Sequence, residues 1–281
     1  DLFEIKYAMA LMLEKGVKVI NLSLGDGEMI VAAQNGAEKA LDALDKWSTS
    51  YEQFFSKCLK QGYDFLLVHG AGNDNGYNWV TCEMSDEHPY GYRTNGNTTD
   101  NDIPDYRVEY DVFAAIENEE VEPHILIVGA AENDMGNYRI ANFNNSGEQI
   151  DVYAPGVDIL SDLPSNITGL KTGTSMATPI VTGVASLVWG VNPKLSAVQV
   201  ADIIRASANV TYGDSTKTST LENGISLVNA YYAVRLAMSK SGDGENNPIA
   251  SGVITGMPYA IDEDGSYEEI GNITVTVTNA E

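Results

Sequence analysis

The stretch of the sequence with the clearest chemical potential is Gly173–Pro179, which reads GTSMATP. In it, Ser175 lies where a loop containing glycine meets the start of a predicted apolar helix, Ser175–Trp189. The serine hydroxyl and its backbone N–H would face the same space, and the helix dipole would favour negative charge developing there. The stretch is not a G-x-S-x-G elbow, because Ala177 replaces the second glycine. Ser175 is therefore a candidate nucleophile, and the alternative is an ordinary serine at a helix start.

Four other blocks accompany this serine. They read VINLSLG at Val19–Gly25, GAGND at Gly70–Asp74, FNNSG at Phe143–Gly147 and DVYAPG at Asp151–Gly156. Together with GTSMATP, and in this order, they resemble the signature segments of the subtilisin-like serine proteases, the subtilase or peptidase S8 family. The blocks extend from Val17 to the helix near Lys240. The resemblance implies the C-terminal part of that family's catalytic domain.

The resemblance also implies roles for individual residues. Ser175 would attack the scissile carbonyl, while the side-chain amide of Asn73 and the Ser175 backbone N–H would donate to the oxyanion. The alternative for Asn73 is a turn asparagine that hydrogen-bonds its own loop. Two backbone segments would flank an extended substrate as added strands, and their glycines would allow close approach, although glycine there could also simply end a strand. The residues expected to bind substrate are Ser23, Leu24, Gly25, Gly70, Ala71, Gly72 and Thr174.

The histidine and aspartate of the family's triad have no candidates in matching motifs. In the family both precede the substrate-binding strand, whereas only sixteen residues precede Val17 here. We expect His69, His88 and His124 to have structural or surface roles. The chain is therefore expected to need an upstream part of the same protein to complete the triad, and to be inactive alone. Without that part, apolar surface of the sheet would be exposed, which is expected to cause self-association or marginal stability.

Two other functions compete with a serine endopeptidase. The first is a degenerate, non-catalytic relative that serves as a binding or adhesion module, although such a module has no use for both Ser175 and Asn73. The second is a serine hydrolase of another fold in which Lys171, four residues before Ser175, acts as the base. Nothing in the position of Lys171 suggests a depressed pKa, and the order of the blocks does not suit this reading.

The candidate site residues must be positioned by predicted strands and helices, which alternate along the chain. This alternation predicts an α/β fold with a mostly parallel sheet flanked by helices. Without the upstream part this sheet would be incomplete. Hydrophobic spacing predicts helices over Leu2–Glu14, Asp42–Lys60, Ser175–Trp189, Asn192–Ala208 with Ser196 as N-cap, and Gly224–Lys240. Short apolar runs predict strands over Val17–Leu24, Asp64–His69, His124–Gly129 and Ile150–Tyr153.

The composition changes after Lys240, which predicts a domain boundary. Residues 1–240 are interpreted as the peptidase domain without its N-terminal part, and residues 241–250 as a linker with two Gly and two Asn residues. Residues 251–281 are expected to start a β-rich module or C-terminal extension, because Ile273–Thr278 alternates strictly between apolar and polar residues.

The charge of the chain restricts its partners. Among 281 residues, 40 Asp and Glu oppose 16 Lys and Arg, and the formal net charge is −24. Phosphates of nucleic acids and anionic membranes would be repelled, and no uninterrupted apolar run reaches the length of a membrane span. The expected partner is a peptide or protein substrate. The acidic insert Tyr77–Glu122 is expected to border the cleft and to favour substrates with basic residues.

Metal and redox chemistry receive little support from the sequence. With two cysteines, Cys58 and Cys82, no CxxC and three histidines, a zinc site is disfavoured, and the cysteines could form one disulfide or remain two thiols. The chemistry requires no cofactor. Oxygen-bearing residues in Asn95–Asp102 could hold a structural calcium ion, but they lack the spacing of a calcium-binding loop. Secretion or a cell-surface location is implied by the family resemblance alone.

Overall fold

The computed structural model describes residues 2–75, 105–134, 137–164, 166–208 and 225–240, and four short strands beyond them. The chain divides into two compact units, Asp1–Lys240 and Ser241–Glu281. The helices of the first unit are α1 (Leu2–Glu14), α2 (Gly27–Gln34), α3 (Glu38–Lys60), α4 (Thr174–Val191), α5 (Ala197–Ser207) and α6 (Ala230–Ser239). Its strands are β1 (Val19–Leu22), β2 (Leu66–Gly70), β3 (Ile125–Asp134), β4 (Asn137–Ile140), β5 (Val152–Pro155), β6 (Ile159–Leu163) and β7 (Ile167–Lys171). Short 3-10 turns cover Val108–Tyr110 and Glu122–His124.

The second unit contains two antiparallel strand pairs. Strand β8 (Ile254–Gly256) pairs with β11 (Ile273–Val275). Strand β9 (Tyr259–Ile261) pairs with β10 (Tyr267–Glu269).

The central sheet of the first unit is mostly parallel, as predicted. Strands β1, β2, β3 and β5 lie in this order and run parallel, with Leu22 opposite His69 and Gly70 opposite Val128. Strand β4 is antiparallel and pairs with the end of β3. Because β1 and β2 are parallel, their carboxyl ends meet at one edge of the sheet.

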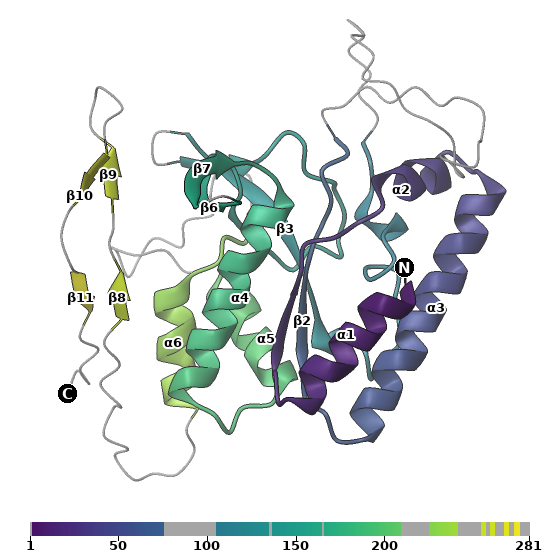
Figure 1. Ribbon diagram of the computed structural model, residues 1–281, viewed down its shortest axis with the longest axis horizontal. Helices are drawn as coiled ribbons and strands as arrows, with labels where there is room; N and C mark the ends of the chain where they lie inside the picture. Colours follow the sequence, from purple (N-terminus) through teal and green to yellow (C-terminus); the bar gives the residue numbers. More distant parts are fainter. Residues whose placement is uncertain are drawn as a thin grey trace, which may run out of the picture. The chain divides into compact units, whose positions relative to one another are not determined.

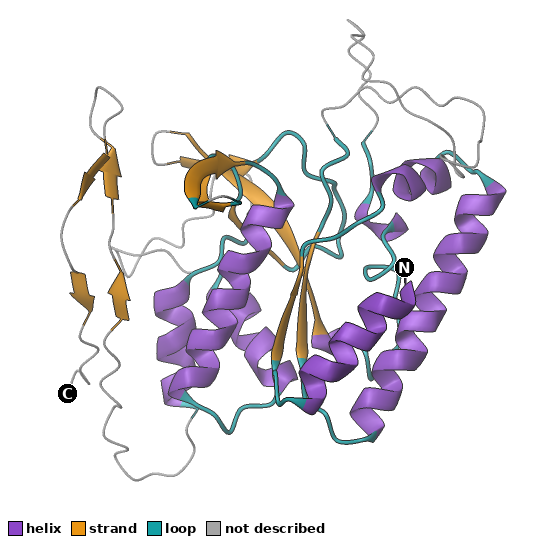
Figure 2. Ribbon diagram, viewed as in Figure 1, coloured by secondary structure: helices purple, strands orange, loops and turns teal. Residues whose placement is uncertain are grey.

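Helices cover both faces of this sheet (Figures 1 and 2). Leu66 and Val68 of β2 pack into the core beneath α4, α5 and α6, whereas Leu67 packs into the core formed with α1, α2 and α3. The alternation follows from the two-residue period of a strand. A strand buried on both faces needs apolar residues at every position, which explains the continuous apolar runs in the sequence.

The predicted helices are present, with shifted ends in several cases. Helix α1 has the predicted bounds, and Ser196 is the N-cap of α5, where its side chain and that of Gln199 form a capping box. Helix α2 was not predicted. Its residues Met29–Ala33 are all buried, so the segment lacks the one-sided apolar period that reveals a helix. The β6–β7 hairpin also had no clear sequence signal.

Helix α4 is the central helix of the fold. It contacts β1, β2, β3 and β5. Among the described helices it alone has the length and apolar composition of a membrane span, with a mean hydropathy of 1.3. However, 44% of its residues are buried inside the protein.

Candidate active site

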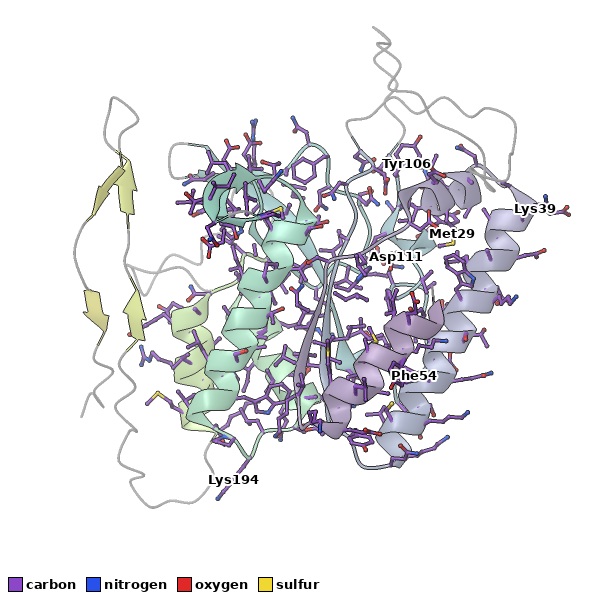
Figure 3. The ribbon with its side chains drawn as sticks, viewed as in Figure 1. Met29, Lys39, Phe54, Tyr106, Asp111 and Lys194 are labelled. Carbon is purple, nitrogen blue, oxygen red and sulfur yellow. The ribbon has the colours of Figure 1, made fainter. Side chains whose placement is uncertain are left out.

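A cavity of about 490 Å³ lies at the carboxyl ends of β1 and β2, where α4 begins. Segments from distant parts of the sequence meet there, because parallel strands deliver their following loops to one edge. The lining residues are Ser23, Leu24, Gly25, Gly27, Glu28, Ile30, Gly70, Gly72, Asn73, Asp74, Asp111, Thr174 and Ser175. Figure 3 shows Asp111 at this end of the sheet, near α2.

Ser175 is the second residue of α4 and is half-buried against the cavity. The helix is preceded by Gly173, whose φ of +152° is strained for any residue with a side chain. The Ser175 backbone N–H belongs to the first helical turn, which has no intrahelical acceptors. It makes no hydrogen bond to the residues that the structure describes. A hydroxyl and a backbone donor of the same residue are therefore both available at the cavity.

Asn73 is held in one orientation by Thr174. The Thr174 backbone N–H donates to Asn73 Oδ1 at 2.7 Å, and the Thr174 hydroxyl lies 3.1 Å from the same oxygen. Because a backbone N–H can only donate, the atom facing it must be the amide oxygen. This leaves Asn73 Nδ2 as a donor beside Gly173 and the nucleophile turn.

The loop that carries Asn73 is clamped from the FNNSG block. Asn145 Oδ1 accepts a 2.8 Å hydrogen bond from the Asp74 backbone N–H, and Asn145 Nδ2 donates to Asp74 Oδ2 at 2.8 Å. Gly72 has a φ of +98°, and a Cβ there would collide with the Asn145 side chain. The FNNSG block therefore positions the loop rather than facing the cavity.

A second clamp acts one residue further along the loop. Asn75 Nδ2 donates to the Asn144 carbonyl at 2.8 Å, and Asn75 Oδ1 accepts from the Tyr106 backbone N–H at 2.6 Å. Asn144 in turn accepts a 2.6 Å bond from the Ala130 N–H through its side-chain oxygen. These bonds join the loop to β3, so its geometry is set by the core.

The strand-end segment after β1 is bonded directly to the nucleophile helix. Pro179 lies inside α4 and has no N–H, so the Ser175 carbonyl has no helical donor four residues ahead. The Ser23 hydroxyl donates to this carbonyl at 3.1 Å. Gly70 of β2 also lies close to the start of α4, because a Cβ added at Gly70 would be 3.0 Å from Thr174 Oγ1. Small side chains thus allow both segments to approach the start of α4.

Asp111 is a buried carboxylate in the cavity wall. Its Oδ1 accepts hydrogen bonds from the backbone N–H groups of Phe113 at 2.9 Å and Ala114 at 3.3 Å. The same oxygen lies 3.0 Å from His69 Nε2, in an ion-pair contact without the alignment of a hydrogen bond. The His69 ring also packs against Phe113, with ring centroids 4.6 Å apart.

The pKa of His69 reflects this partner. Complete burial lowers the pKa of the imidazole, but the Asp111 charge, the Asp111 contact and the bond between Nδ1 and the Leu22 carbonyl raise it more. The net result is a pKa above the ordinary histidine value.

The described histidines lie outside the cavity lining. His69 is 0% exposed and shares the α1–α3 face of β2 with Leu67. His124 is buried, and its Nδ1 lies 2.8 Å from the Phe65 carbonyl. Both have structural surroundings, as expected from the sequence, whereas His88 lies outside the described residues.

Most residues proposed from the sequence converge on this cavity. Ala71 differs, because it is 0% exposed in the core and its N–H donates to the Val128 carbonyl. Sequence reasoning did not name Glu28, Asp74 or Asp111 as site residues. Two of them had a signal, because Asp74 follows Asn73 directly and Asp111 belongs to the acidic insert Tyr77–Glu122, which was expected to border the cleft. Glu28 is brought in by α2, a helix that the sequence pattern does not reveal.

The metal and redox expectations fall partly outside the described residues. The stretch Asn95–Asp102 and Cys82 lie in the undescribed segment. Within the described residues, no group of three or more His, Cys, Asp or Glu side chains is arranged to hold a metal ion. Cys58 is a buried free thiol, and burial raises its pKa.

Comparison with known proteins supports the family resemblance. The subtilase family model matches residues 3–232. Subtilisin of Bacillus pumilus is 42% identical over 86 residues, which cover 31% of this chain and 30% of the relative. Subtilisin-like protease 12 of Trichophyton verrucosum (strain HKI 0517) is 41% identical over 105 residues, covering 36% of this chain and 25% of the relative. The aligned part therefore spans less than a third of each relative.

Solved structures agree in fold. The prenylagaramide maturation protease PagA aligns with a TM-score of 0.50 and 24% identity, over 85% of this chain and 68% of its own. A variant of the protease domain of PatA aligns with the same TM-score and 22% identity, over 85% and 66%. With a parallel sheet of this kind and a family match over most of its length, the chain belongs to the subtilase family of serine proteases.

Proposed function

We propose that the complete protein is a serine endopeptidase in which Ser175 is the nucleophile and Asn73 an oxyanion donor. The observation that carries this proposal is the convergence of three groups on one cavity. These groups are the Ser175 hydroxyl, the Ser175 backbone N–H and Asn73 Nδ2, which the bond from Thr174 to Oδ1 turns toward the nucleophile turn. The alternative role, an N-cap serine, is taken by Gly173 instead, and a serine in the first helical turn without a catalytic role would not require such an oriented amide beside it.

The chemistry follows from these groups. Ser175 Oγ forms a bond to the substrate carbonyl carbon while its proton passes to a base, and the carbonyl oxygen becomes an oxyanion. The oxyanion accepts hydrogen bonds from Asn73 Nδ2 and Ser175 N–H. Collapse breaks the C–N bond, the amine leaves with a proton, and water then hydrolyses the acyl-enzyme ester. These steps use protein groups and water, with no cofactor.

The substrate backbone would lie between two segments, Ser23–Gly25 and Gly70–Gly72. They follow adjacent parallel strands and both border the cavity. Leu24 is exposed there, and Gly25 has open space at its Cβ position. An extended peptide could pair with these edges through backbone hydrogen bonds. Thr174, between Gly173 and the nucleophile, would keep Asn73 in place rather than contact the reacting bond.

The general base would come from another part of the protein. No histidine lines the cavity among the described residues, and His69 is sealed between β1 and Asp111. We propose that an upstream part supplies the histidine and its aspartate, and that this chain alone is inactive. With these two residues, Ser175 would form a Ser-His-Asp triad like that of the family.

A fluorophosphonate probe tests the assignment, because it labels activated serine nucleophiles. The complete protein is expected to be labelled at Ser175, as located by peptide mass spectrometry, and its Ser175→Ala variant should not be labelled. Ser186→Ala, in the same helix, is a matched control that should retain labelling. Stoichiometric labelling of the isolated chain would contradict the proposal that its general base lies in another part of the protein. Labelling of the complete protein at another residue would contradict the assignment of Ser175 as the nucleophile.

A further inference from the structure

The charge of the cavity lining is entirely negative among the described residues. Glu28, Asp74 and Asp111 contribute carboxylates, and no Lys, Arg or His side chain lines the cavity. Asp74 and Asp111 are 5% and 4% exposed, so they are largely shielded from bulk solvent. Carboxylates in such a site interact with a cation more strongly than they would at the surface.

One oxygen of the Asp111 side chain makes all of its contacts with the described residues. The Phe113 and Ala114 N–H groups and His69 Nε2 all meet Oδ1. Within the described part of the chain, Oδ2 accepts no hydrogen bond, and it is not a fully buried unsatisfied atom. Because Asp111 lines the cavity, this second oxygen is the one left to meet a ligand.

The neighbouring carboxylates are placed differently. Glu28 lies on α2 and is half-buried, whereas Asp74 is engaged by Asn145 in the clamp of the Asn73 loop. Asp111 is therefore the carboxylate best placed for specific contact, and Glu28 adds charge on the α2 side. His69 can offset one of these charges when it is protonated. The lining keeps an excess of negative charge with His69 in either state.

We infer that Asp111 selects substrates with arginine or lysine at the residue whose carbonyl Ser175 attacks, with Glu28 reinforcing this preference. The inference rests on the proposed function and names its substrate class. The side chain of that residue would enter between Ser23–Gly25 and Gly70–Gly72, since both segments line the same cavity as Asp111. A guanidinium or ammonium group would supply the donors that Asp111 Oδ2 lacks. An acidic side chain would be repelled by the same lining.

Cleavage specificity provides the first test. The complete protein is incubated with a peptide library, and mass spectrometry identifies the residue before each cleaved bond. Enrichment of arginine and lysine supports the inference, and cleavage mainly after apolar or acidic residues overturns it. With matched peptides that differ only at this residue, kcat/KM for arginine should exceed that for leucine at least about tenfold.

Variants assign the preference to Asp111. Asp111→Asn keeps an oxygen for the Phe113 N–H and should lower the arginine-to-leucine ratio of kcat/KM about tenfold or more. Glu28→Gln should lower it less. Asp42→Asn removes an exposed carboxylate from α3 and is the control for net charge, so the ratio should not change. An unchanged ratio in folded Asp111→Asn, or an equal fall in Asp42→Asn, would overturn the role of Asp111.

A binding measurement separates this inference from the proposed function and does not require a stable Asp111 variant. Benzamidine is a cation, and benzamide is its neutral counterpart of similar shape. Calorimetry or NMR with the unmodified chain should show benzamidine binding at least about tenfold more tightly. Equal binding overturns the inference even if the complete enzyme is active. If the complete protein cleaves no peptide and resists fluorophosphonate while benzamidine is preferred, the proposed function fails and the cation site stands.

Discussion

At the scale of single residues, the site depends on polar side chains whose orientation is fixed by backbone donors. Asn73 is the clearest case, because the Thr174 N–H determines which end of its amide faces the nucleophile. Its identity could be proposed from the GAGND block, but its orientation could not. Orientation depends on a partner 101 residues away in the sequence.

Replacement of Asn73 tests its proposed work on the oxyanion. Asn73→Ala in the complete protein should lower kcat about 10²- to 10³-fold with little change in KM, the loss established for the oxyanion-hole asparagine of subtilisin rather than a value obtained from this structure. The loss is expected because the donated bond strengthens only in the transition state. Steady-state kinetics measures it, with Asn35→Ala, beyond the end of α2, as a control. A change in KM alone would contradict the assignment.

His69 and Asp111 form a buried pair whose stability depends on pH. Because the pKa of folded His69 is raised, the folded state binds a proton more tightly than the unfolded chain. The resulting stabilisation is fully present below the ordinary pKa of about 6.5 and is lost as pH rises through the folded pKa. His69→Gln, which keeps a donor near Asp111, should therefore cost more stability at low pH than at high pH. Urea unfolding across this pH range measures the difference.

The same pair can be observed directly by histidine NMR titration. Asp111→Asn removes the charge that raises the pKa of His69 and leaves burial, which lowers it. The pKa of His69 should therefore fall in this variant. A His69 pKa that is unchanged in the folded variant would show that Asp111 is not its main partner.

At the scale of elements, the sequence was sufficient where the apolar residues have a helical or strand period. The α1 bounds and the Ser196 cap follow from local rules. Helix α2 has an N-cap, Asp26, whose side chain accepts a hydrogen bond from the Met29 N–H, but buried residues around its circumference remove the periodic signal that would reveal a helix. Asp111 is similar, since the sequence placed the insert Tyr77–Glu122 beside the cleft but did not single out this carboxylate of the cavity wall. Its place depends on tertiary packing against His69 and Phe113.

The bond between Ser23 and helix α4 can be tested by a double-mutant cycle. Ser23→Ala should lower the free energy of unfolding by about 1 kcal/mol, because the Ser175 carbonyl loses its donor. In a Pro179→Ala background, residue 179 regains an N–H that can bond the same carbonyl, so the cost of Ser23→Ala should be smaller. Urea unfolding of the four proteins gives the coupling. Equal costs in both backgrounds would show that the hydroxyl does not compensate for the proline.

At the scale of the whole molecule, the net charge of −24 and an exposed apolar surface have opposite effects on self-association. Leu11 and Met12 of α1 are 40% and 43% exposed, and β1 has one neighbour, β2, among the described strands of the sheet. An edge strand with apolar side chains nearby favours association with another chain. Repulsion between acidic copies opposes this contact and is weakened by salt. The two effects together determine whether the chain is a monomer.

The chain is therefore expected to self-associate, more strongly at high salt than at low salt. Sedimentation velocity over a range of concentrations should show a rising average mass. Leu11→Glu should shift the distribution toward monomer, because it places charge on the α1 surface. Leu41→Glu on α3 is the matched control, since Leu41 is 39% exposed and the substitution adds the same charge. If both variants shift the distribution equally, net charge alone controls association, and a monomer at every concentration and salt would show that the α1 surface makes no such contact.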